Sequence, residues 1–369
     1  MPLSKIQSLS EVSAGRRNLI INGAFQVFQR ATAATAATTS YNTADRFKAD
    51  TSSDGAFTTE KSTDNPFGTG SSLKAQVTTA DTSLASTQYA RILQNIEAQN
   101  LQHLLYGTSS AKTLTLSFWV KSSKTGIYSI TLRKVDNTPY HFTHEYTISS
   151  ANTWEKKIIT ITPTAGSTSF ITSSAGAIAN DNGLGLELSF ALGQGSSYAI
   201  GTSNTWSSNT STYASSNQVN WLDNTSNNFY LTQVQLEIGT TASEFEHRSF
   251  AEELTLCQRY FQAVVPKGVN IGYVAPAWFY SSSTMVAILD HKVEMRAPPT
   301  VESVDATDDF WFYRTSTYDG FNDLQLSAPS STKCTAVYNA SDVSGTTGHA
   351  GGIFVNDTTN AFLYLKAEL

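Results

Sequence analysis

The sequence predicts a mainly β protein, in which a β-sandwich is followed by one connecting α-helix and a smaller antiparallel β domain. Many short segments alternate apolar and polar residues, which is the period of half-buried strands, and turn residues separate these segments. One segment near residue 250 has helical spacing instead. A length of 369 residues exceeds one ordinary core and fits two domains.

The composition supports this fold class and excludes several functions. Hydrophobic residues make up 40% of the chain and charged residues 15%, so its polarity comes mainly from Ser, Thr, Asn and Gln. A helical bundle needs more Glu and Lys on its surface, and 11% aromatic residues is enough to build cores, unlike a disordered chain. The net charge of −6 offers no basic face to nucleic acid. Since no apolar run has the length of a signal core or a membrane span, we expect no export signal and no membrane insertion.

The amino-terminal part is predicted to hold about eight strands at the spacing of a sandwich. Residues 1–17 lack a period and are expected to form an extended arm. Asn18–Phe25 is predicted as the first strand, whereas the Ala and Thr run at 31–39 has no apolar stripe and is predicted as a surface excursion. Segment 88–105 fits a strand or a helix. The remaining predicted strands lie at 73–77, 114–120, 128–132, 158–161, 184–190 and 230–238.

The segment Phe229–Phe261 joins the two β parts of the chain. Alternation up to Ile238 predicts the last strand of the sandwich. Ser249 and Glu252 then have the spacing of a capping box, in which each side chain bonds a backbone amide of the other residue. The apolar positions at helical spacing are Phe250, Leu254, Cys257 and Phe261. These signals predict a connecting helix over residues 249–262.

Four parts of the chain follow: an arm over 1–17, a sandwich domain over 18–248, a helix over 249–262 and an antiparallel β domain over 263–369. The strands predicted in the last part lie within 270–296 and at 310–313, 324–326, 334–338 and 361–365. We expect Leu254, Cys257 and Phe261 to pack across the joint between the domains. Cys257 lies on the apolar stripe, so we expect a buried thiol rather than a disulfide with Cys334.

The clusters that suggest catalysis or metal binding have a simpler structural explanation. His141 and His144 would share a face only in a helix, but the residues around them are strand-like, so we expect no zinc site. Asp308 and Asp309 are adjacent and would point to opposite faces of a strand, and with Asp305 they fit a solvated turn better than a glycosidase pair. The chain also lacks a phosphate-binding loop, a nucleophile elbow and a dinucleotide-binding glycine motif. We expect a protein that is not an enzyme.

Aromatic side chains are the candidates for ligand binding. Rings on the face or rim of a sheet stack on the apolar faces of sugars, while Asn, Gln and Asp nearby bind the hydroxyls. The candidate glycan-binding residues are Trp119, Trp206, Tyr213, Trp221, Trp278 and Trp311. For any single ring, covering a loop or contacting another subunit is the stronger explanation, because exposed apolar patches mark interfaces of every kind.

Several segments, in this order along the chain, carry a resemblance to a known group of proteins. They are Asn18–Phe25 with Gln29, Arg30 and Thr43–Phe47, then Leu116–Lys121, Asn152–Glu155, Val234–Gly239, Phe245–Ser249, Glu253–Phe261 and Met295–Thr300. Together they resemble structural proteins of bacteriophage tails and fibres that carry a jelly-roll domain of the carbohydrate-binding-module type. The most specific part is the succession of two motifs, Val-Gln-Leu-Glu at 234–237 followed by Cys-Gln-Arg-Tyr at 257–260. Residues 366–369 also look like the close of such proteins.

The resemblance implies a virion protein, assembled in the host cytoplasm, in a tail or fibre that contacts the host. It implies a jelly roll over residues 18–248, a virion-docking arm, and a receptor-contacting tip over 263–369. Its partners would be other tail or adaptor proteins and a host-surface polysaccharide or receptor. Trimers are usual in such fibres, so a homotrimer is favoured, although this chain has no heptad-repeat stalk and no β-helical repeat.

The resemblance also bears on metal binding. Jelly rolls of this type often hold a structural calcium through an Asp in the last strand, but Leu231–Val234 contains no carboxylate. A calcium ion would have only Glu237 and Asn22 as candidate ligands, so we expect no cofactor.

Two other functions stay open. The chain could be an adaptor or a head-decoration protein, in which case its aromatic patches would all be subunit contacts. The third alternative is a depolymerase that cuts surface polysaccharide.

Overall fold

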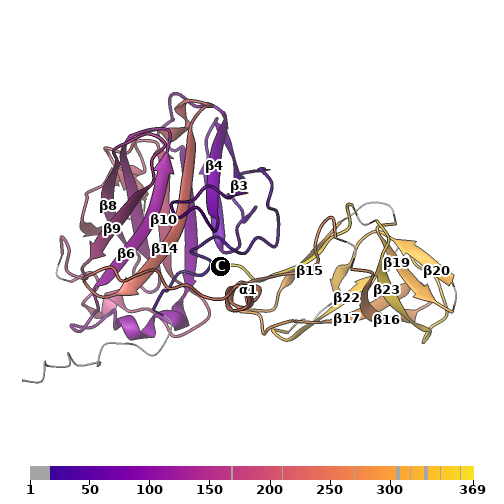
Figure 1. Ribbon diagram of the computed structural model, residues 1–369. Coiled ribbons are helices and arrows are strands. Elements are labelled where there is room, and N and C mark those ends of the chain that lie inside the picture. The colour runs from indigo at the N-terminus through magenta and orange to yellow at the C-terminus, as the bar shows by residue number, and fades with distance from the viewer. Residues whose placement is uncertain are drawn as a thin grey trace, which may run out of the picture.

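The computed structural model describes residues 17–167, 169–209, 211–269, 271–304, 308–315, 317–327, 331–340, 342–357 and 359–369. They form two lobes with a short helix, α1 (Phe250–Gln258), between them, and the carboxyl end lies beside this helix (Figure 1). The larger lobe is a sandwich of two six-stranded sheets, and the smaller one contains a three-stranded and a seven-stranded sheet. The predicted fold class is therefore confirmed. Of the arm predicted over 1–17, all but Arg17 lies outside the described residues.

The sandwich lobe packs two antiparallel sheets face to face. From edge to edge, the first sheet consists of β1 (Thr35–Ala36), β3 (Ala56–Ser62), β4 (Ser72–Thr79), β14 (Asn228–Ile238), β6 (Leu114–Ser122) and β9 (Glu155–Ile161). The second sheet consists of β12 (Thr205–Ser207), β8 (Tyr140–Ile148), β7 (Gly126–Lys134), β10 (Leu184–Gln194), β5 (Tyr89–Glu97) and β2 (Phe47–Ser52). Because the chain crosses between the sheets after most of the long strands, the lobe is a jelly roll. A parallel pair, β11 (Ala199–Gly201) and β13 (Ala214–Ser215), lies in the long connection before β14.

Alternation places the apolar side chains of both sheets in one core. On β6, the fully buried apolar side chains are Leu114, Leu116, Phe118 and Val120. The ring of Phe118 contacts those of Tyr146 and Phe190 on the second sheet, at centroid distances of 5.2 and 5.1 Å. The strands predicted at 73–77, 114–120, 128–132, 158–161, 184–190 and 230–238 are all confirmed. Segment 88–105 is a strand, β5, followed by the 3-10 helix η2 (Ala98–Leu104).

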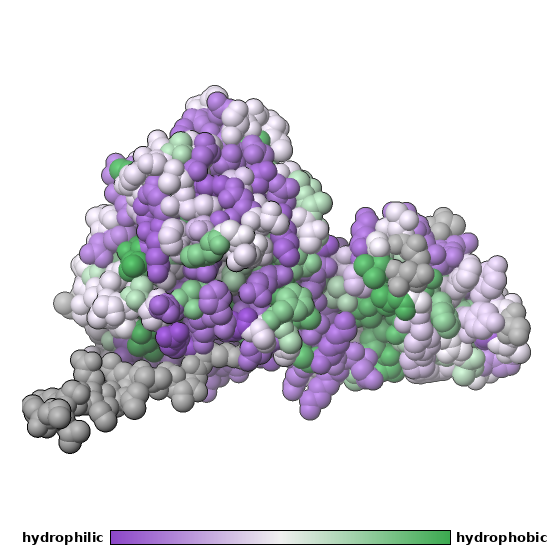
Figure 2. Space-filling view, in the orientation of Figure 1, coloured by the Kyte–Doolittle hydropathy of each residue, from purple (hydrophilic) through white to green (hydrophobic). Residues whose placement is uncertain are grey.

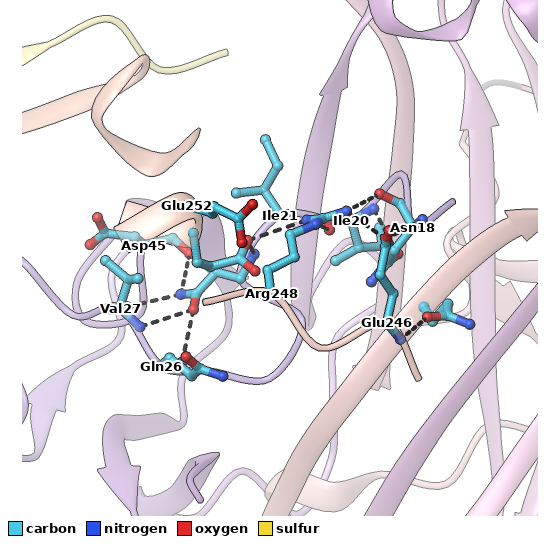
Figure 3. Close-up of polar contacts among 12 residues, drawn as sticks. Asn18, Ile20, Ile21, Gln26, Val27, Asp45, Glu246, Arg248 and Glu252 are labelled. Atoms are coloured by element: carbon cyan, nitrogen blue, oxygen red, sulfur yellow. Dashed lines mark hydrogen bonds and ion pairs between the residues drawn. The ribbon is translucent and has the colours of Figure 1, made fainter. Parts of the chain in front are cut away.

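The strand predicted over Asn18–Phe25 is wrong. This segment is an irregular loop, in which Asn22 and Phe25 have positive φ angles of 60° and 51°. Several of its backbone amides bond side chains: Ile20 N–H donates to Asn18 Oδ1 at 2.9 Å, and Asn22 N–H donates to Glu253 Oε1 at 2.5 Å. One amide reaches a strand, since Leu19 N–H donates to Leu236 O of β14 at 2.9 Å, but no ladder continues from it. Figure 3 shows how these polar side chains surround the segment. Side-chain acceptors therefore replace the neighbouring strand that a ladder would need.

Helix α1 begins as predicted and ends earlier. Ser249 Oγ accepts from Glu252 N–H at 3.3 Å, and Glu252 Oε2 accepts from Ser249 N–H at 2.9 Å, so the capping box is confirmed. The helix ends at Gln258, and Phe261 is the first residue of strand β15 (Phe261–Val265). The predicted helix over 249–262 was therefore about one turn too long at its end.

The apolar stripe predicted for this helix is only partly correct. Cys257 is fully buried, but Leu254 is half-buried and Phe250 is 56% exposed. The carboxylate of Glu253 is buried instead, because it accepts from Asn22 N–H and pairs with Arg248 at 3.4 Å. The helix thus packs on a polar network rather than on an apolar joint. Both cysteine thiols are free, so Cys257 forms no disulfide with Cys334.

The carboxyl-terminal lobe has two antiparallel sheets. The three-stranded sheet is β15, β24 (Leu363–Lys366) and β18 (Thr300–Ser303). The seven-stranded sheet is β20 (Thr317–Phe321), β19 (Phe310–Arg314), β23 (Ala350–Val355), β16 (Tyr273–Ser281), β17 (Thr284–Asp290), β22 (Cys334–Asn339) and β21 (Gln325–Ser327). One face of the larger sheet covers a second core, in which the rings of Phe279 and Phe312 meet edge to face at 5.0 Å.

Buried ion pairs join the two lobes. Glu368, just after β24, accepts from Arg30 Nη2 at 2.9 Å and from Arg46 Nη1, both in the sandwich lobe. The Arg46 side chain is 1% exposed, and its guanidinium carbon lies 3.5 Å from the Tyr260 ring centroid. Glu97 at the end of β5 accepts from Arg259 and from the Tyr260 hydroxyl, the latter at 2.7 Å. Charged groups therefore join the lobes together with Phe261, which is 1% exposed and whose ring centroid lies 3.6 Å from the Arg30 guanidinium carbon.

No helix in the described ranges combines the length and the apolar character that crossing a membrane requires.

Candidate carbohydrate-binding surfaces

Two of the six predicted glycan-binding rings are core residues. Trp206 on β12 is 1% exposed, and its Nε1–H donates to Thr162 O at 2.9 Å. Trp221, in the 3-10 helix η4 (Trp221–Asp223), is fully buried and meets the Phe57 ring edge to face at 5.7 Å. The predictions for Trp206 and Trp221 are wrong, because the polar loop that carries them folds onto the sandwich and inserts both rings into its core.

Trp119 lies on the outer face of the first sheet, as its strand position predicted. It is half-buried, and the exposed Phe67 ring meets it edge to face at 5.5 Å. Trp154 and Tyr230 form a second pair on this sheet, with centroids 6.0 Å apart. Lys121 lies over both rings, 4.2 Å from the Tyr230 centroid, and pairs with Asp64, so charged groups cover much of this surface. A sugar would find ring edges and ion pairs here rather than a flat aromatic face.

Tyr213 belongs to a cluster of three tyrosines on the second sheet. Its ring stacks on Tyr198 at 4.6 Å and meets Tyr89 at 5.3 Å. The Arg91 guanidinium carbon also lies 4.0 Å from the Tyr213 centroid. Because the ring is already in contact with Arg91 and Tyr198, little of it remains free for a ligand.

Two carboxylates neutralise the charge of Arg91 itself. It pairs with Asp50 at 2.6 Å and with Glu187 at 2.9 Å, and all three side chains are at most 9% exposed. Burial alone would lower the pKa of Arg91, but Glu187 and Asp50 more than offset it, so the pKa is raised. The cluster has the composition of a sugar site, yet its donors and acceptors already satisfy one another.

Trp278 and Trp311 share the outer face of the seven-stranded sheet. On β16, Ala275, Ala277 and Phe279 are buried, so the alternate residues, Trp278 among them, point to the opposite face. The pairs Phe354–Trp311 and Tyr313–Tyr318 are directly opposite each other on neighbouring strands. Together these residues form what we call the aromatic face: Tyr273, Trp278, Tyr280, Trp311, Tyr313, Tyr318 and Phe354.

Five rings of the aromatic face contact one another, and several of its rings remain open to solvent. Trp311 stacks on Tyr318 at 4.4 Å, and Phe354 meets the rings of Tyr273 at 5.4 Å and Tyr313 at 5.9 Å. Exposed fractions are 37% for Trp278, 46% for Tyr313 and 55% for Tyr318. Among the predicted candidates, Trp278 and Trp311 are therefore the two that the structure places on the same outer face of this sheet, at separate positions along β23.

The aromatic face is nearly free of charge. Among the described residues on this side of β16, β17, β19, β20 and β23, Asp290 at the end of β17 is the one charged residue. Of 15 exposed large hydrophobic side chains in the described ranges, nine lie beyond residue 262, in less than a third of the chain. On the face of the molecule in Figure 2, hydrophobic residues are also denser on this lobe than on the sandwich. Such a concentration is typical of a binding surface.

Sequence reasoning missed the tyrosines of this face. Pro276, Trp278 and Tyr280 alternate with Ala275, Ala277 and Phe279, so both sides of β16 read as apolar. A strand with two apolar sides is ordinarily covered on both. Because only one side of this sheet covers a core, the apolar residues on the other side of β16 had to be exposed. The two apolar sides of this strand were therefore the signal that could have identified the aromatic face.

The structure places His141 and His144 on strand β8, as the strand-like residues around them indicated. His141 is 1% exposed, and its Nδ1 lies 2.7 Å from Asn209 O. No group of three or more His, Cys, Asp or Glu side chains that could hold a metal occurs in the described ranges. Asp308 is exposed and Asp309 is buried, while Asp305 lies outside the described residues.

Burial makes His141 a pH-sensitive residue. Burial, and then the nearby Arg133, lowers the pKa of His141 to about 4. The unfolded chain takes up this proton near pH 6.5, so the contribution of neutral His141 to stability is present above that pH and lost as the pH falls toward 4. We expect His141→Gln to reduce the loss of stability between pH 7 and pH 5, measured by denaturant midpoints. The exposed His247 is the control, since His247→Gln should leave the loss unchanged; an equal effect of both variants would contradict this role.

The residues left for a calcium ion do not fit one. Asn22 Oδ1 already accepts from the backbone amides of Gln26 at 2.9 Å and Val27 at 3.0 Å. Glu237 Oε1 accepts from Ser243 N–H at 2.9 Å. Calcium requires six to eight oxygen ligands around one centre, and these two groups serve separate turns of the backbone.

Comparison with protein-family models and with curated proteins found no match. Among solved structures, the chain is similar to the enzymatically active domain of tailspike protein 4 of bacteriophage CBA120, with 12% identity and a TM-score of 0.31 over 60% of this chain and 21% of that chain. A putative sugar-binding protein from Bacteroides thetaiotaomicron shows 15% identity and a TM-score of 0.35, over 60% and 100%. A family 11 carbohydrate-binding module from Clostridium thermocellum shows 14% identity and a TM-score of 0.30, over 54% of this chain and 91% of that chain. The chain spans about a fifth of the tailspike structure, and these values assign it to no family.

Proposed function

We propose that this chain is a structural component of a bacteriophage tail or fibre that binds carbohydrate on the host surface. The proposal rests on the resemblance of its segments to such proteins and, above all, on the aromatic face. Rings of this kind stack on the apolar faces of sugars, because the C–H groups of a pyranose meet the negative face of the ring. The sandwich lobe would then hold this face away from the virion.

The low charge and the exposed rings of the aromatic face favour a saccharide. Trp311 and Tyr318 lie nearly parallel, at 26°, and Tyr313 is opposite Tyr318 on the next strand. A chain of several sugar units could lie across such adjacent rings, with one weak contact at each. In a homotrimer, the presence of several copies would make weak binding effectively tight, since linked sites increase the local ligand concentration.

Removal of Trp278 tests this proposal. We expect Trp278→Ala to weaken binding to the polysaccharide recognised on a glycan array by about tenfold, which corresponds to about 1.4 kcal/mol. The loss follows from the removal of one exposed stacking surface, while the fold remains intact. Binding is measured by titrating the purified protein with that polysaccharide.

The matched control is Trp119→Ala, on the outer face of the first sheet. This variant should bind as the unchanged protein does. If Trp119→Ala lost binding and Trp278→Ala did not, the site would lie on the sandwich lobe. If the unchanged protein bound no glycan, while virions still required it, the protein would be a scaffold.

A second candidate function is purely structural. An uncharged aromatic face is also what a subunit contact needs, and it would then be covered in an adaptor or a head decoration. Solvent labelling of tyrosines in assembled particles separates these alternatives, because a glycan-binding face stays accessible after assembly. For the third alternative, depolymerisation, release of reducing ends from host capsule would be required; we propose a non-catalytic role.

A further inference from the structure

A groove of about 660 Å³ lies where the two lobes meet. One wall comes from residues 30–42 of the sandwich lobe, and the other from 296–302 and 364–368 of the carboxyl-terminal lobe, near the carboxyl end marked in Figure 1. Its volume is within the range of about 300–1,000 Å³ that is usual for small-ligand sites. The lining residues that carry the argument are Arg30, Tyr41, Asn42, Arg296, Tyr364 and Lys366.

Arg30 presents a guanidinium that is fixed in place at the groove wall. Its side chain is 9% exposed, and its guanidinium carbon lies 3.6 Å from the Phe261 ring centroid, so its position is held by packing. Nη2 donates to Glu368 at 2.9 Å. Nη1 is buried and has no hydrogen-bond partner in the described part of the chain, although Asp45 Oδ1 lies 3.6 Å away. Nη1 therefore faces Asp45 as an ion pair without a hydrogen bond, and packing and charge together hold the guanidinium at the groove wall.

Arg296 adds a positive charge that no carboxylate neutralises. Its Nε, Nη1 and Nη2 donate to the backbone oxygens of Ala367, Asn182 and Glu368, at 2.9, 2.7 and 3.0 Å. Within the described ranges, no carboxylate lies at ion-pair distance from it. These three bonds also fix the guanidinium at the junction. The charge of Arg296 is therefore both held in place and uncompensated.

The other side-chain charges around the groove are paired with one another. Lys366 pairs with Glu302 at 2.7 Å. Next to the groove, the two arginines Arg30 and Arg46 pair with two carboxylates, those of Asp45 and Glu368. The oxygen of the terminal Leu369 accepts from the Tyr41 hydroxyl at 3.2 Å, so a further carboxylate lies beside the groove. Among the described residues, Arg296 is the cation of the groove wall that has no carboxylate at ion-pair distance, which favours a ligand with a negative charge.

The remaining lining residues suit a sugar ring better than a small inorganic anion. Tyr41 and Tyr364 are half-buried and offer aromatic surface, and Asn42 offers an amide. Phosphate alone would leave these groups, and most of the volume, unused. A ring with hydroxyls and one carboxylate would use all of them.

We propose that this groove binds one carboxylated sugar residue, such as a hexuronate. Its carboxylate would meet Arg30 and Arg296, its ring would lie against Tyr364, and its hydroxyls would bond Asn42. The groove is a second site, separate from the aromatic face, and does not depend on it.

The test is a ligand-observed NMR titration of the full chain with glucuronate, galacturonate and N-acetylneuraminate, and with glucose, galactose and inorganic phosphate. We expect at least one acidic sugar to bind at least fivefold more tightly than both neutral sugars and phosphate. Asn42→Asp, which puts a carboxylate in the groove, should weaken this binding at least tenfold. Asn224→Asp, at an exposed turn of the sandwich lobe, adds the same charge elsewhere and should leave the binding unchanged.

Each other result would overturn the proposal. If none of the three acidic sugars bound, or if the neutral sugars bound equally tightly, the groove would not be a site for an acidic sugar. Phosphate binding as tight as that of the best acidic sugar would show a site for any anion. Equal effects of Asn42→Asp and Asn224→Asp would place binding outside the groove. Trp278→Ala should not change this titration, so failure of the groove and failure of the aromatic face can be told apart.

Discussion

Replacing Glu368 by Gln is expected to lower the free energy of unfolding by about 3–5 kcal/mol, the usual cost of breaking a buried ion pair from one side. Glu368 is 11% exposed and neutralises Arg30 and Arg46, whose side chains are 9% and 1% exposed. Burial would lower the pKa of Arg46, and Glu368 more than offsets this, so the pKa is raised. Without the carboxylate, Arg46 would keep its contacts with Asn95 O and the Tyr260 ring, but its charge would have no carboxylate at ion-pair distance among the described residues. Denaturant unfolding of both proteins measures the difference.

The control is an ion pair of the same type in a more open place. Glu60 accepts from Lys74 at 2.7 Å on the first sheet, with side chains 27% and 24% exposed. Glu60→Gln should cost less than about 1 kcal/mol, because solvent screens such a pair. Equal losses for Glu368→Gln and Glu60→Gln would mean that the junction does not depend on its buried charges.

Replacing Trp221 by Ala is expected to destabilise the protein by about 3–5 kcal/mol, as for large aromatic residues deleted from a core. Trp221 is fully buried, and its ring packs against Phe57 of the first sheet. The truncation would leave a cavity between η4 and that sheet, which the surrounding strands can fill only in part. Thermal and denaturant unfolding would both show the loss.

Trp278→Ala is the matched comparison, since it removes the same side chain from the surface. It should change the free energy of unfolding by less than about 1 kcal/mol. A Trp221→Ala protein of normal stability that had lost glycan binding would restore the ligand-binding role first predicted for this ring.

The strands of the sandwich were predictable because apolar side chains alternate with polar ones along them. Leu114, Leu116 and Phe118 alternate with polar residues, and this period alone locates β6 and its inward side. The capping box of α1 was predictable for a similar reason, since Ser249 and Glu252 satisfy each other locally. The predictions that depend on residues close together in the sequence are therefore confirmed by the structure.

Features that depend on distant partners were not predictable. Asn18–Phe25 reads as a strand, but Glu253 and Gln94, far along the chain, supply the acceptors for its amides. Trp221 lies in a polar loop by sequence, and only the closure of that loop onto the sandwich buries it. Phe250 has the spacing of a core position, yet the surface beside the helix is polar.

The candidate site was predictable in part for the same reason. Trp278 and Trp311 stand out as tryptophans, but the register of β19 with β23 and β20 is needed to bring Trp311 beside Phe354 and Tyr318. The groove between the lobes combines Arg30 with Arg296, and no local pattern connects these two residues.

The ion pairs of the junction also bear on the order of events when the chain folds. Arg46 and Glu368 are separated by 322 positions, whereas β7 and β8 pair across a short turn. Bringing distant residues together costs chain entropy that only the finished contact repays, so such contacts form late. Association of the two lobes is therefore expected to follow the formation of the sheets, and a chain stopped before that step would expose the arginines of one lobe and the carboxylate of the other.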